Sequence, residues 1–269
     1  MIKLIVTDMD GTFLDSNSEY DQKVFSLLFE KLKKKNVNFV ACSGKQCECL
    51  QTIFSEDVKD DIWYVGDSAT RIIYKGETLF ESYLPLEIAL EIINNLENYG
   101  DYFGTVVCTT KAAYVNSKIN LNILEVFKGS FKGLEKLNSL NLLIDNIFKI
   151  TIYDPTGKSN LIYNKLKEKY SKRAYVVASE PKWLDICAKD AHKGSTIKKI
   201  QEMLQITPEE TLVFGDGEND IELMKVAKHS YAMANGCENI KKVAKHIAKS
   251  NNENGVLEVI QDYLERGLI

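Results

Sequence analysis

Two carboxylates near the start of the chain, Asp8 and Asp10, are separated by one residue and followed by Gly11 and Thr12. Like charges this close repel each other unless a cation or a shared proton offsets them. The spacing therefore suggests a divalent metal site, in which one carboxylate can attack an electrophile while the other moves a proton. An acidic turn without chemistry is the alternative, because a pattern this short also arises by chance.

A second acidic group, Asp216 with Asn219 and Asp220, lies far along the chain. Each group follows an apolar run that is typical of a buried strand, at residues 2–6 and at residues 211–214. Parallel strands end at the same edge of a sheet, so both groups can converge on one hard cation. Mg²⁺ prefers such oxygen ligands and keeps several waters. The alternative is a polar loop in which Asn219 or Asp220 caps the next helix.

Ser43 and Gly44 follow a third apolar run, at residues 37–42. A hydroxyl group suits a phosphate when it lies beside the free N–H groups at the start of a helix. Ser43 can equally cap the helix expected over residues 46–54. The residues themselves leave both possibilities open.

The motifs need a parallel sheet to bring them together, and the chain has the pattern for one. Apolar runs alternate with segments of helical periodicity, which predicts right-handed strand–helix–strand units. We expect strands at residues 2–6, 37–42, 62–65 and 211–214, a hairpin at residues 71–80, and helices at residues 20–35, 46–54 and 196–204. Asp21 is the expected N-cap of the first helix.

The middle of the chain has a different pattern, in which two strands follow a helix. This pattern predicts an antiparallel sheet with helices on one face, and the stretch 128–146 has no clear assignment. We therefore predict a core made of residues 1–82 and 190–269, with an α+β domain inserted at residues 83–189. Trp63 and Trp183 are expected in the protein core. The expected helices lie at residues 86–99, 119–127 and 159–170, and the strands at residues 103–108, 112–115, 148–153, 174–178 and 183–187.

The composition limits the classes of partner. Of 269 residues, 45% are hydrophobic and 27% are charged, which is typical of a globular protein with a sizeable core. The net charge is −4 without a long basic run, so we expect neither a nucleic-acid partner nor a membrane partner. The N-terminus has no signal-peptide pattern. The six cysteines are scattered and indicate reduced thiols, so we expect a cytoplasmic protein. We also expect either a monomer or a weak homodimer.

Four motifs in sequence order resemble those of the haloacid dehalogenase-like (HAD) hydrolases. They are Asp8-x-Asp10-Gly11-Thr12, Ser43-Gly44, Lys193-Gly194 and Gly215-Asp216-Gly217-x-Asn219-Asp220. The insert between the second and third motifs is similar to the cap of the Cof-type (type IIB) phosphatases. Residues 232–235 and 254–256 resemble the C-terminal signatures of the same subfamily. The resemblance implies an α/β fold with a Rossmann-like parallel-sheet core and an inserted α+β cap domain.

The resemblance also implies a role for each motif residue. Asp8 would be the nucleophile and Asp10 the general acid and base of a phosphatase. Mg²⁺ would be held by Asp8, the backbone carbonyl of Asp10 and Asp216, with Asp220 in the surrounding layer. The substrate would be a small phosphorylated metabolite, with sugar phosphates first. Its phosphate group would be contacted by Met9, Thr12, Ser43, Gly44, Lys193 and Asn219.

Several residues depart from the usual family pattern. Lys45 stands where Arg is common, Asp67-Ser68 where Asn-Gly is common, and His192 where a small residue is common. These differences bear on substrate specificity more than on activity. The resemblance implies that the phosphatase forms an aspartyl-phosphate intermediate at Asp8. The alternatives are a phosphomutase that uses the same intermediate, and a non-catalytic regulator that binds a metabolite.

Overall fold

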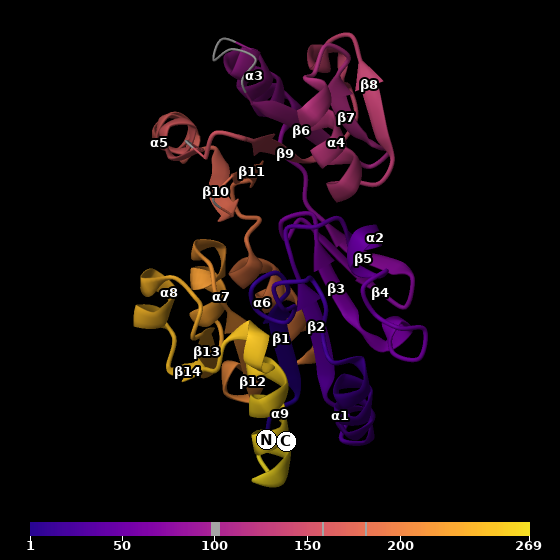
Figure 1. Ribbon diagram of the computed structural model, residues 1–269, viewed down its shortest axis with the longest axis vertical. Helices are drawn as coiled ribbons and strands as arrows, with labels where there is room; N and C mark the ends of the chain where they lie inside the picture. Colours follow the sequence, from indigo (N-terminus) through magenta and orange to yellow (C-terminus); the bar gives the residue numbers. More distant parts are fainter. Residues whose placement is uncertain (98–102, 158, 181) are drawn as a thin grey trace.

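The computed structural model describes residues 1–97, 103–157, 159–180 and 182–269. Figure 1 shows two lobes stacked along the long axis, each built around its own sheet. The two chain ends lie side by side at the bottom of the lower lobe, where the Ile2 N–H donates to the Leu268 carbonyl at 2.8 Å. Among the described residues, no helix combines the length and apolar character that crossing a membrane requires.

The lower lobe contains a mostly parallel sheet. Within the described residues its eight strands are β1 (Leu4–Asp8), β2 (Asn38–Cys42), β3 (Trp63–Gly66), β4 (Arg71–Tyr74), β5 (Glu77–Glu81), β12 (Thr211–Gly215), β13 (His229–Met233) and β14 (His246–Ala248). Their order is β14-β13-β12-β1-β2-β3-β4-β5. The strands from β14 to β3 are parallel, and β4 and β5 add an antiparallel hairpin. The predicted parallel strands and the predicted hairpin are confirmed.

Helices cover both faces of this sheet, which explains why its strands are continuous apolar runs. Ile5 of β1 packs on one face, whereas Leu4 and Val6 pack on the other. The helices are α1 (Gln22–Lys34), α2 (Cys47–Leu50) and α9 (Gly255–Glu265) on the Ile5 face, and α6 (Lys193–Leu204), α7 (Ile221–Met224) and α8 (Glu238–Val243) on the opposite face.

The predicted N-cap of α1 is confirmed, because the Asp21 carboxylate accepts a hydrogen bond from the Val24 N–H at 3.0 Å.

Helix α2 is shorter than the helix predicted over residues 46–54. The chain after Leu50 continues as turns, although Phe54 is buried in the same cluster. The apolar spacing in this segment therefore reflects contact with the core, and it does not require a continuous helix.

The upper lobe contains a mostly antiparallel sheet. Its strands, counted over the described part of the chain, are the six elements β6 (Gly104–Thr109), β7 (Ala113–Asn116), β8 (Leu134–Leu137), β9 (Ile147–Tyr153), β10 (Ala174–Glu180) and β11 (Trp183–Ala188). Their order is β10-β11-β9-β6-β7-β8, with β7 and β8 parallel. Strand β8 lies in the stretch that the sequence leaves unassigned. Its inner two residues are both exposed, so it lacks the alternation of a half-buried strand.

The helices of the upper lobe lie on both faces of the sheet, so the prediction that they share one face is wrong. Helices α3 and α5 pack on the face that carries Val107, whereas α4 packs on the face that carries Val106. Gly104 makes room for α4, because a Cβ atom there would lie 2.3 Å from the Ile123 side chain. The prediction for the first helix reached residue 99, which is outside the described residues. The helices are α3 (Leu86–Glu97), α4 (Leu121–Ser130) and α5 (Ser159–Tyr170).

All strands of the upper sheet come from residues 104–188, between the two parts of the chain that form the lower sheet. At the entry to the upper lobe, the Leu84 N–H donates to the Ile147 carbonyl at 2.8 Å. The division into domains at residues 82/83 and 189/190 stays a prediction.

Candidate active site

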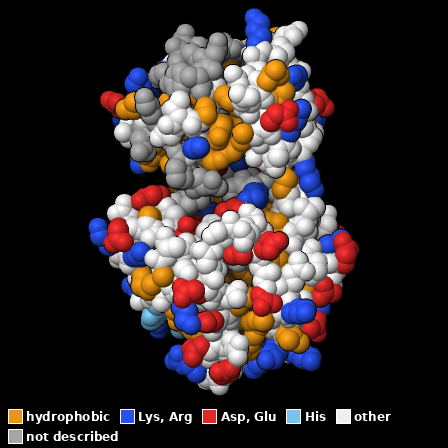
Figure 2. Space-filling view, in the orientation of Figure 1, with side chains coloured by type: hydrophobic (Ala, Val, Ile, Leu, Met, Phe, Trp, Pro, Cys, Tyr) orange, Lys and Arg blue, Asp and Glu red, His pale blue; other side chains and the backbone are white. Residues whose placement is uncertain are grey.

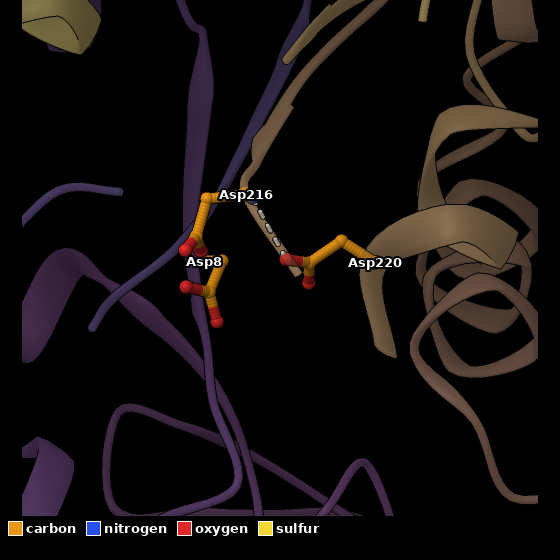
Figure 3. Close-up of side chains that lie close together, drawn as sticks. All are labelled: Asp8, Asp216 and Asp220. Carbon is orange, nitrogen blue, oxygen red and sulfur yellow. Dashed lines mark hydrogen bonds between the residues drawn. The ribbon is translucent and has the colours of Figure 1, made fainter. Parts of the chain in front are cut away.

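Three carboxylates among the described residues, those of Asp8, Asp216 and Asp220, meet at the ends of two neighbouring strands (Figure 3). Asp8 is the last residue of β1, and Asp216 directly follows β12, which pairs with β1 in parallel. Asp220 lies one turn later and points back toward Asp216. One oxygen from each carboxylate lies within 4.8 Å of the others. The sheet thus brings together acidic groups from opposite ends of the chain.

Lys193 brings an ammonium group into contact with these carboxylates. It is the first residue of α6, and its side chain is 4% exposed. The ammonium group forms an ion pair with Asp8 Oδ1 and a second one, at 2.5 Å, with Asp220 Oδ1. His192 caps the helix, with its Nδ1 accepting a hydrogen bond from the Ser195 N–H at 3.2 Å. The cap fixes the point at which the lysine side chain leaves the helix.

Both oxygen atoms of the Asp220 carboxylate are bonded to neighbouring groups of the site. Its Oδ2 accepts hydrogen bonds from the backbone N–H groups of Asp216 and Gly217, both at 3.0 Å. Figure 3 shows this link to the backbone of Asp216 as a dashed line. Since Oδ1 is paired with Lys193, Asp220 is placed to orient both the lysine and the loop that carries Asp216.

Burial and mutual repulsion control the ionisation of these groups. Burial raises the pKa of Asp8 well above its usual value, and Lys193 opposes that shift. Burial, with the Asp220 carboxylate second, raises the pKa of Asp216 to about 6. Burial works against the charged form of Lys193, but Asp220 and Asp8 outweigh it and raise the lysine pKa well above its usual value. Within the described residues, three carboxylates facing one ammonium leave an excess of negative charge, which suits a hard divalent cation.

Gly11 and Thr12 shape the turn beneath Asp216. The Thr12 hydroxyl donates to Asp216 Oδ1 at 2.9 Å. Gly11 has φ of +78°, and a Cβ atom on it would lie 2.5 Å from Asp216 Oδ2. The Asn235 side-chain amide donates to the Gly11 carbonyl at 2.7 Å. The glycine is therefore required both by the backbone conformation and by the close approach of the carboxylate.

The loop after β2 brings a second lysine to the site. Ser43 accepts a hydrogen bond at its hydroxyl from the Lys45 N–H at 3.1 Å. The Lys45 ammonium forms an ion pair with Asp10 Oδ2. From the sequence, Lys45 was identified only as a departure from a common arginine; in the structure it is the ion-pair partner of the second carboxylate.

Met9 and Thr12 were predicted to contact phosphate, but both are buried, and the Thr12 hydroxyl is bonded to Asp216. Met9 has a structural role. Its side chain is fully buried in the core cluster, and its carbonyl accepts hydrogen bonds from three backbone N–H groups of the following turn. Any contact of Met9 with a substrate must therefore come from its backbone. Ser43, Gly44 and Asn219 line a cavity between the two lobes, and their contact with phosphate stays a prediction.

A cavity of about 840 Å³ separates the carboxylate cluster from the upper lobe. Figure 2 shows the molecule hollowed at the waist between the two lobes. The lower lobe contributes Asp8, Asp10 and Asp216 to its wall, and the upper lobe contributes Phe131 and Trp183. A volume of this size accommodates a small metabolite.

The upper wall contains polar residues that were not predicted from the sequence. Lys149 and Thr151 of β9 face Asp185 of β11, which pairs directly with Thr151. The i, i+2 spacing of Lys149 and Thr151 inside an apolar strand is a signal that could have found them. Trp63 is buried, as predicted. The prediction that Trp183 lies in the core is wrong, because its side chain is only partly buried and lines the cavity.

Comparisons with known proteins show the family to which the chain belongs. The model of the family described as haloacid dehalogenase-like hydrolase matches residues 5–260. The chain is 28% identical to an Escherichia coli 5-amino-6-(5-phospho-D-ribitylamino)uracil phosphatase, over 98% of this chain and 97% of that protein. The solved structure of SMU.1108c from Streptococcus mutans UA159 has a TM-score of 0.92 and 34% identity, covering 98% of this chain and 100% of that one.

The fold is also that of a characterised sugar phosphatase. The structure of BT4131, a HAD subclass IIB sugar phosphatase, has a TM-score of 0.79 at 18% identity and covers 99% of this chain and 100% of that chain. At this identity the likeness concerns the fold, namely an α/β core with a cap domain. Since the family model spans almost the whole chain, the protein belongs to the haloacid dehalogenase-like hydrolases, in the Cof-type branch, and is a phosphatase of that family.

Proposed function

We propose that this phosphatase hydrolyses small phosphorylated metabolites, foremost sugar phosphates, with Mg²⁺ and through an aspartyl-phosphate intermediate. The observation that carries the proposal is the contact of Lys193 with Asp8 beneath a cavity of about 840 Å³. The Escherichia coli relative is named for a phosphorylated ribityl compound, which supports a metabolite of this size.

Mg²⁺ would be held by the carboxylates of Asp8 and Asp216 and by the backbone carbonyl of Asp10. These donors fit Mg²⁺, because all of them are oxygen atoms. Among the described residues, the three carboxylates of the cluster also outnumber the one ammonium, that of Lys193, which pairs with them. When bound, the ion supplies positive charge that offsets the phosphoryl oxygens.

Asp8 is the nucleophile of the proposed reaction. Its carboxylate oxygen forms a bond to phosphorus while the bond from phosphorus to the leaving oxygen breaks. Asp10 donates a proton to that oxygen, so the alcohol leaves in neutral form. In the second step Asp10 takes a proton from water as the water oxygen attacks phosphorus, which releases phosphate and regenerates Asp8.

The remaining residues bind the phosphoryl group and orient the reacting atoms. Lys193 and the Ser43 hydroxyl would hold the phosphoryl oxygens, with Gly44 and Met9 contributing through the backbone. Asn219 would contact the same group, and Thr12 would keep Asp216 in position through its 2.9 Å hydrogen bond. Asp220 would orient Lys193, since it already pairs with the ammonium at 2.5 Å.

The upper lobe would act as the cap, with domain boundaries at residues 83 and 189. It covers the cavity and would exclude water and select the leaving group. From the net charge of −4 and the scattered cysteines we infer a cytoplasmic enzyme, monomeric or weakly dimeric, whose partners are small metabolites and not nucleic acid or membranes.

A substrate panel with product analysis tests the proposal. Sugar phosphates, nucleotides and phosphorylated cofactors are incubated with the protein and Mg²⁺, and both free phosphate and isomeric esters are measured. We expect free phosphate, with the highest kcat/KM for a sugar phosphate. Accumulation of an isomeric sugar phosphate would identify a phosphomutase, and tight binding without turnover would identify a regulator.

A further inference from the structure

One buried charge of the upper lobe has no part in the reaction proposed above. Lys149 of β9 is 3% exposed at its side chain and lines the cavity. Burial works against its charged form, but Asp185 and other neighbouring groups together outweigh burial, so the pKa of Lys149 lies above its usual value. The group is therefore an ammonium ion at neutral pH, and its partners define what it does.

The ammonium of Lys149 is fully used within the protein. It donates to Asp185 Oδ1 at 3.3 Å, to Ser68 Oγ at 3.1 Å and to the Gly44 carbonyl at 2.8 Å. A lysine ammonium has three hydrogens, so these acceptors leave none for a substrate oxygen. Lys149 is thus unlike Lys193, whose described partners are carboxylates of the active site.

Two of these three bonds cross from the upper lobe to the lower lobe. Asp185 of the upper lobe reinforces them, because Ser68 Oγ donates to its Oδ2 at 2.5 Å. A buried ion pair contributes little net stability, since the loss of hydration offsets the attraction. What the network provides is a defined position of β9 against the two core loops that carry Gly44 and Ser68.

The two core loops are joined to each other. The Asp67 N–H donates to the Lys45 carbonyl at 2.7 Å, and the Asp67 carboxylate accepts from the Cys47 N–H at 3.3 Å. Residues 67–69 all have positive φ, from 52° to 67°, a conformation that non-glycine residues keep only when their surroundings hold it. The loops therefore form one surface, and Lys149 is bonded to it at both Gly44 and Ser68.

We propose that Lys149 is a positioning residue, which holds the Gly44 carbonyl and thereby sets the Ser43–Lys45 loop against the phosphoryl group. The proposal rests on the proposed function, in which Ser43 binds phosphate. It makes the position of the cap a direct determinant of the phosphate loop, because the loop residue between Ser43 and Lys45 is bonded to a cap side chain. The loss of Lys149 should therefore impair every substrate, whatever its leaving group.

The test compares variants that keep the fold. Lys149→Met alone leaves Asp185 buried without its counter-ion, so the double variant Lys149→Met/Asp185→Asn is tested beside it. The control is Lys132→Met, because Lys132 is an exposed lysine of the upper lobe whose ammonium donates to the Glu48 carbonyl of the lower lobe at 3.0 Å. Folding of each variant is checked by its thermal midpoint.

Two substrates and one inhibitor separate positioning from substrate contact. For both p-nitrophenyl phosphate and acetyl phosphate, we expect kcat to fall about 10- to 100-fold in the double variant, with KM within about threefold. Inhibition by orthovanadate, a mimic of the transferring phosphoryl group, should weaken as well. Lys132→Met should behave like the unmodified protein in all three measurements.

The outcomes distinguish this inference from the function on which it rests. A folded double variant with undiminished kcat would overturn the positioning role. A change in KM for one substrate alone would also overturn it, because that pattern indicates contact with the leaving group. An unmodified protein that hydrolyses neither substrate with Mg²⁺ would instead overturn the proposed function.

Discussion

The side chains of Lys193 and Asp8 form a buried ion pair although 185 positions of sequence separate them. The pair exists because β1 and the start of α6 converge at the carboxyl edge of one sheet. Lys193 also binds Asp220, so a single ammonium bridges two carboxylates and offsets their repulsion.

Replacing Lys193 should remove most of the activity. Lys193→Met deletes the charge that would stabilise the phosphoryl oxygens, and we expect kcat to fall about 100- to 1000-fold. The variant should also unfold at a lower temperature, since Asp8 and Asp220 are left buried without a counter-ion. Lys198→Met, which changes an exposed lysine of the same helix, is the matched control and should retain both properties. Equal activity of the two variants would exclude the proposed role of Lys193.

Substitutions at Asp8 and at Asp10 should block different stages of turnover. Asp8→Asn removes the nucleophile and should abolish Mg²⁺-dependent release of phosphate from p-nitrophenyl phosphate. Asp10→Asn should slow turnover severely but still bind substrate, because it removes proton transfer and not the phosphate contacts. Steady-state rates and substrate binding are measured for both, with the exposed Asp262→Asn as the control. Full activity in Asp8→Asn would refute the covalent mechanism.

Mg²⁺ binding should weaken as the pH falls through about 6, where Asp216 takes up a proton in the metal-free protein. Burial raises the pKa of this carboxyl from 3.8, so the folded protein binds the proton more tightly than the unfolded chain does. In the metal-free state the charged Asp216 carboxylate therefore lowers the stability of the fold above about pH 6. This penalty decreases progressively as the pH falls from about 6 toward 3.8.

The increase in thermal midpoint caused by Mg²⁺ measures this competition. The increase should be larger at pH 7.5 than at pH 5.0, since protons and Mg²⁺ compete for the same carboxylate oxygens. A pH-independent increase would show that the ion does not bind at Asp216.

Gly11 and Gly76 provide a matched pair for the turn under the metal site. Their φ values are nearly equal, +78° and +77°, so alanine at either position should cost about 1–2 kcal/mol of folding free energy. Only at Gly11 does the new Cβ atom approach Asp216, at 2.5 Å, whereas at Gly76 nothing lies within 4 Å. Gly11→Ala should therefore also lose activity and Mg²⁺ affinity, while Gly76→Ala keeps them. Denaturant unfolding and steady-state kinetics check the two effects separately.

The core strands could be predicted because burial on both faces leaves an unbroken apolar run, as in Leu4-Ile5-Val6. The polar residue after each run then marks a strand end, which is how Asp8 and Asp216 could be identified. The chemistry assigned to these residues still depended on family resemblance, since the spacing alone is compatible with an acidic turn.

Features that depend on how the lobes dock were not predictable in the same way. The contact of Lys149 with Gly44 is made across two separate elements, and nothing local to either residue specifies it. Strand β8 is exposed at Glu135 and Lys136, so its pairing with β7 leaves no alternation in the sequence. The placement of α4 depended on Gly104, whose importance is apparent only when Ile123 is packed against it.

The hydrogen bond between Ile2 and Leu268 has a practical consequence for handling the protein. Both chain ends lie at the pole of the lower lobe farthest from the waist (Figure 1). A purification tag, a fluorophore or a surface linker attached at either end therefore leaves the cavity mouth open to solvent. Joining the two ends through a short linker would likewise allow new ends to be opened elsewhere without disturbing the carboxylate cluster.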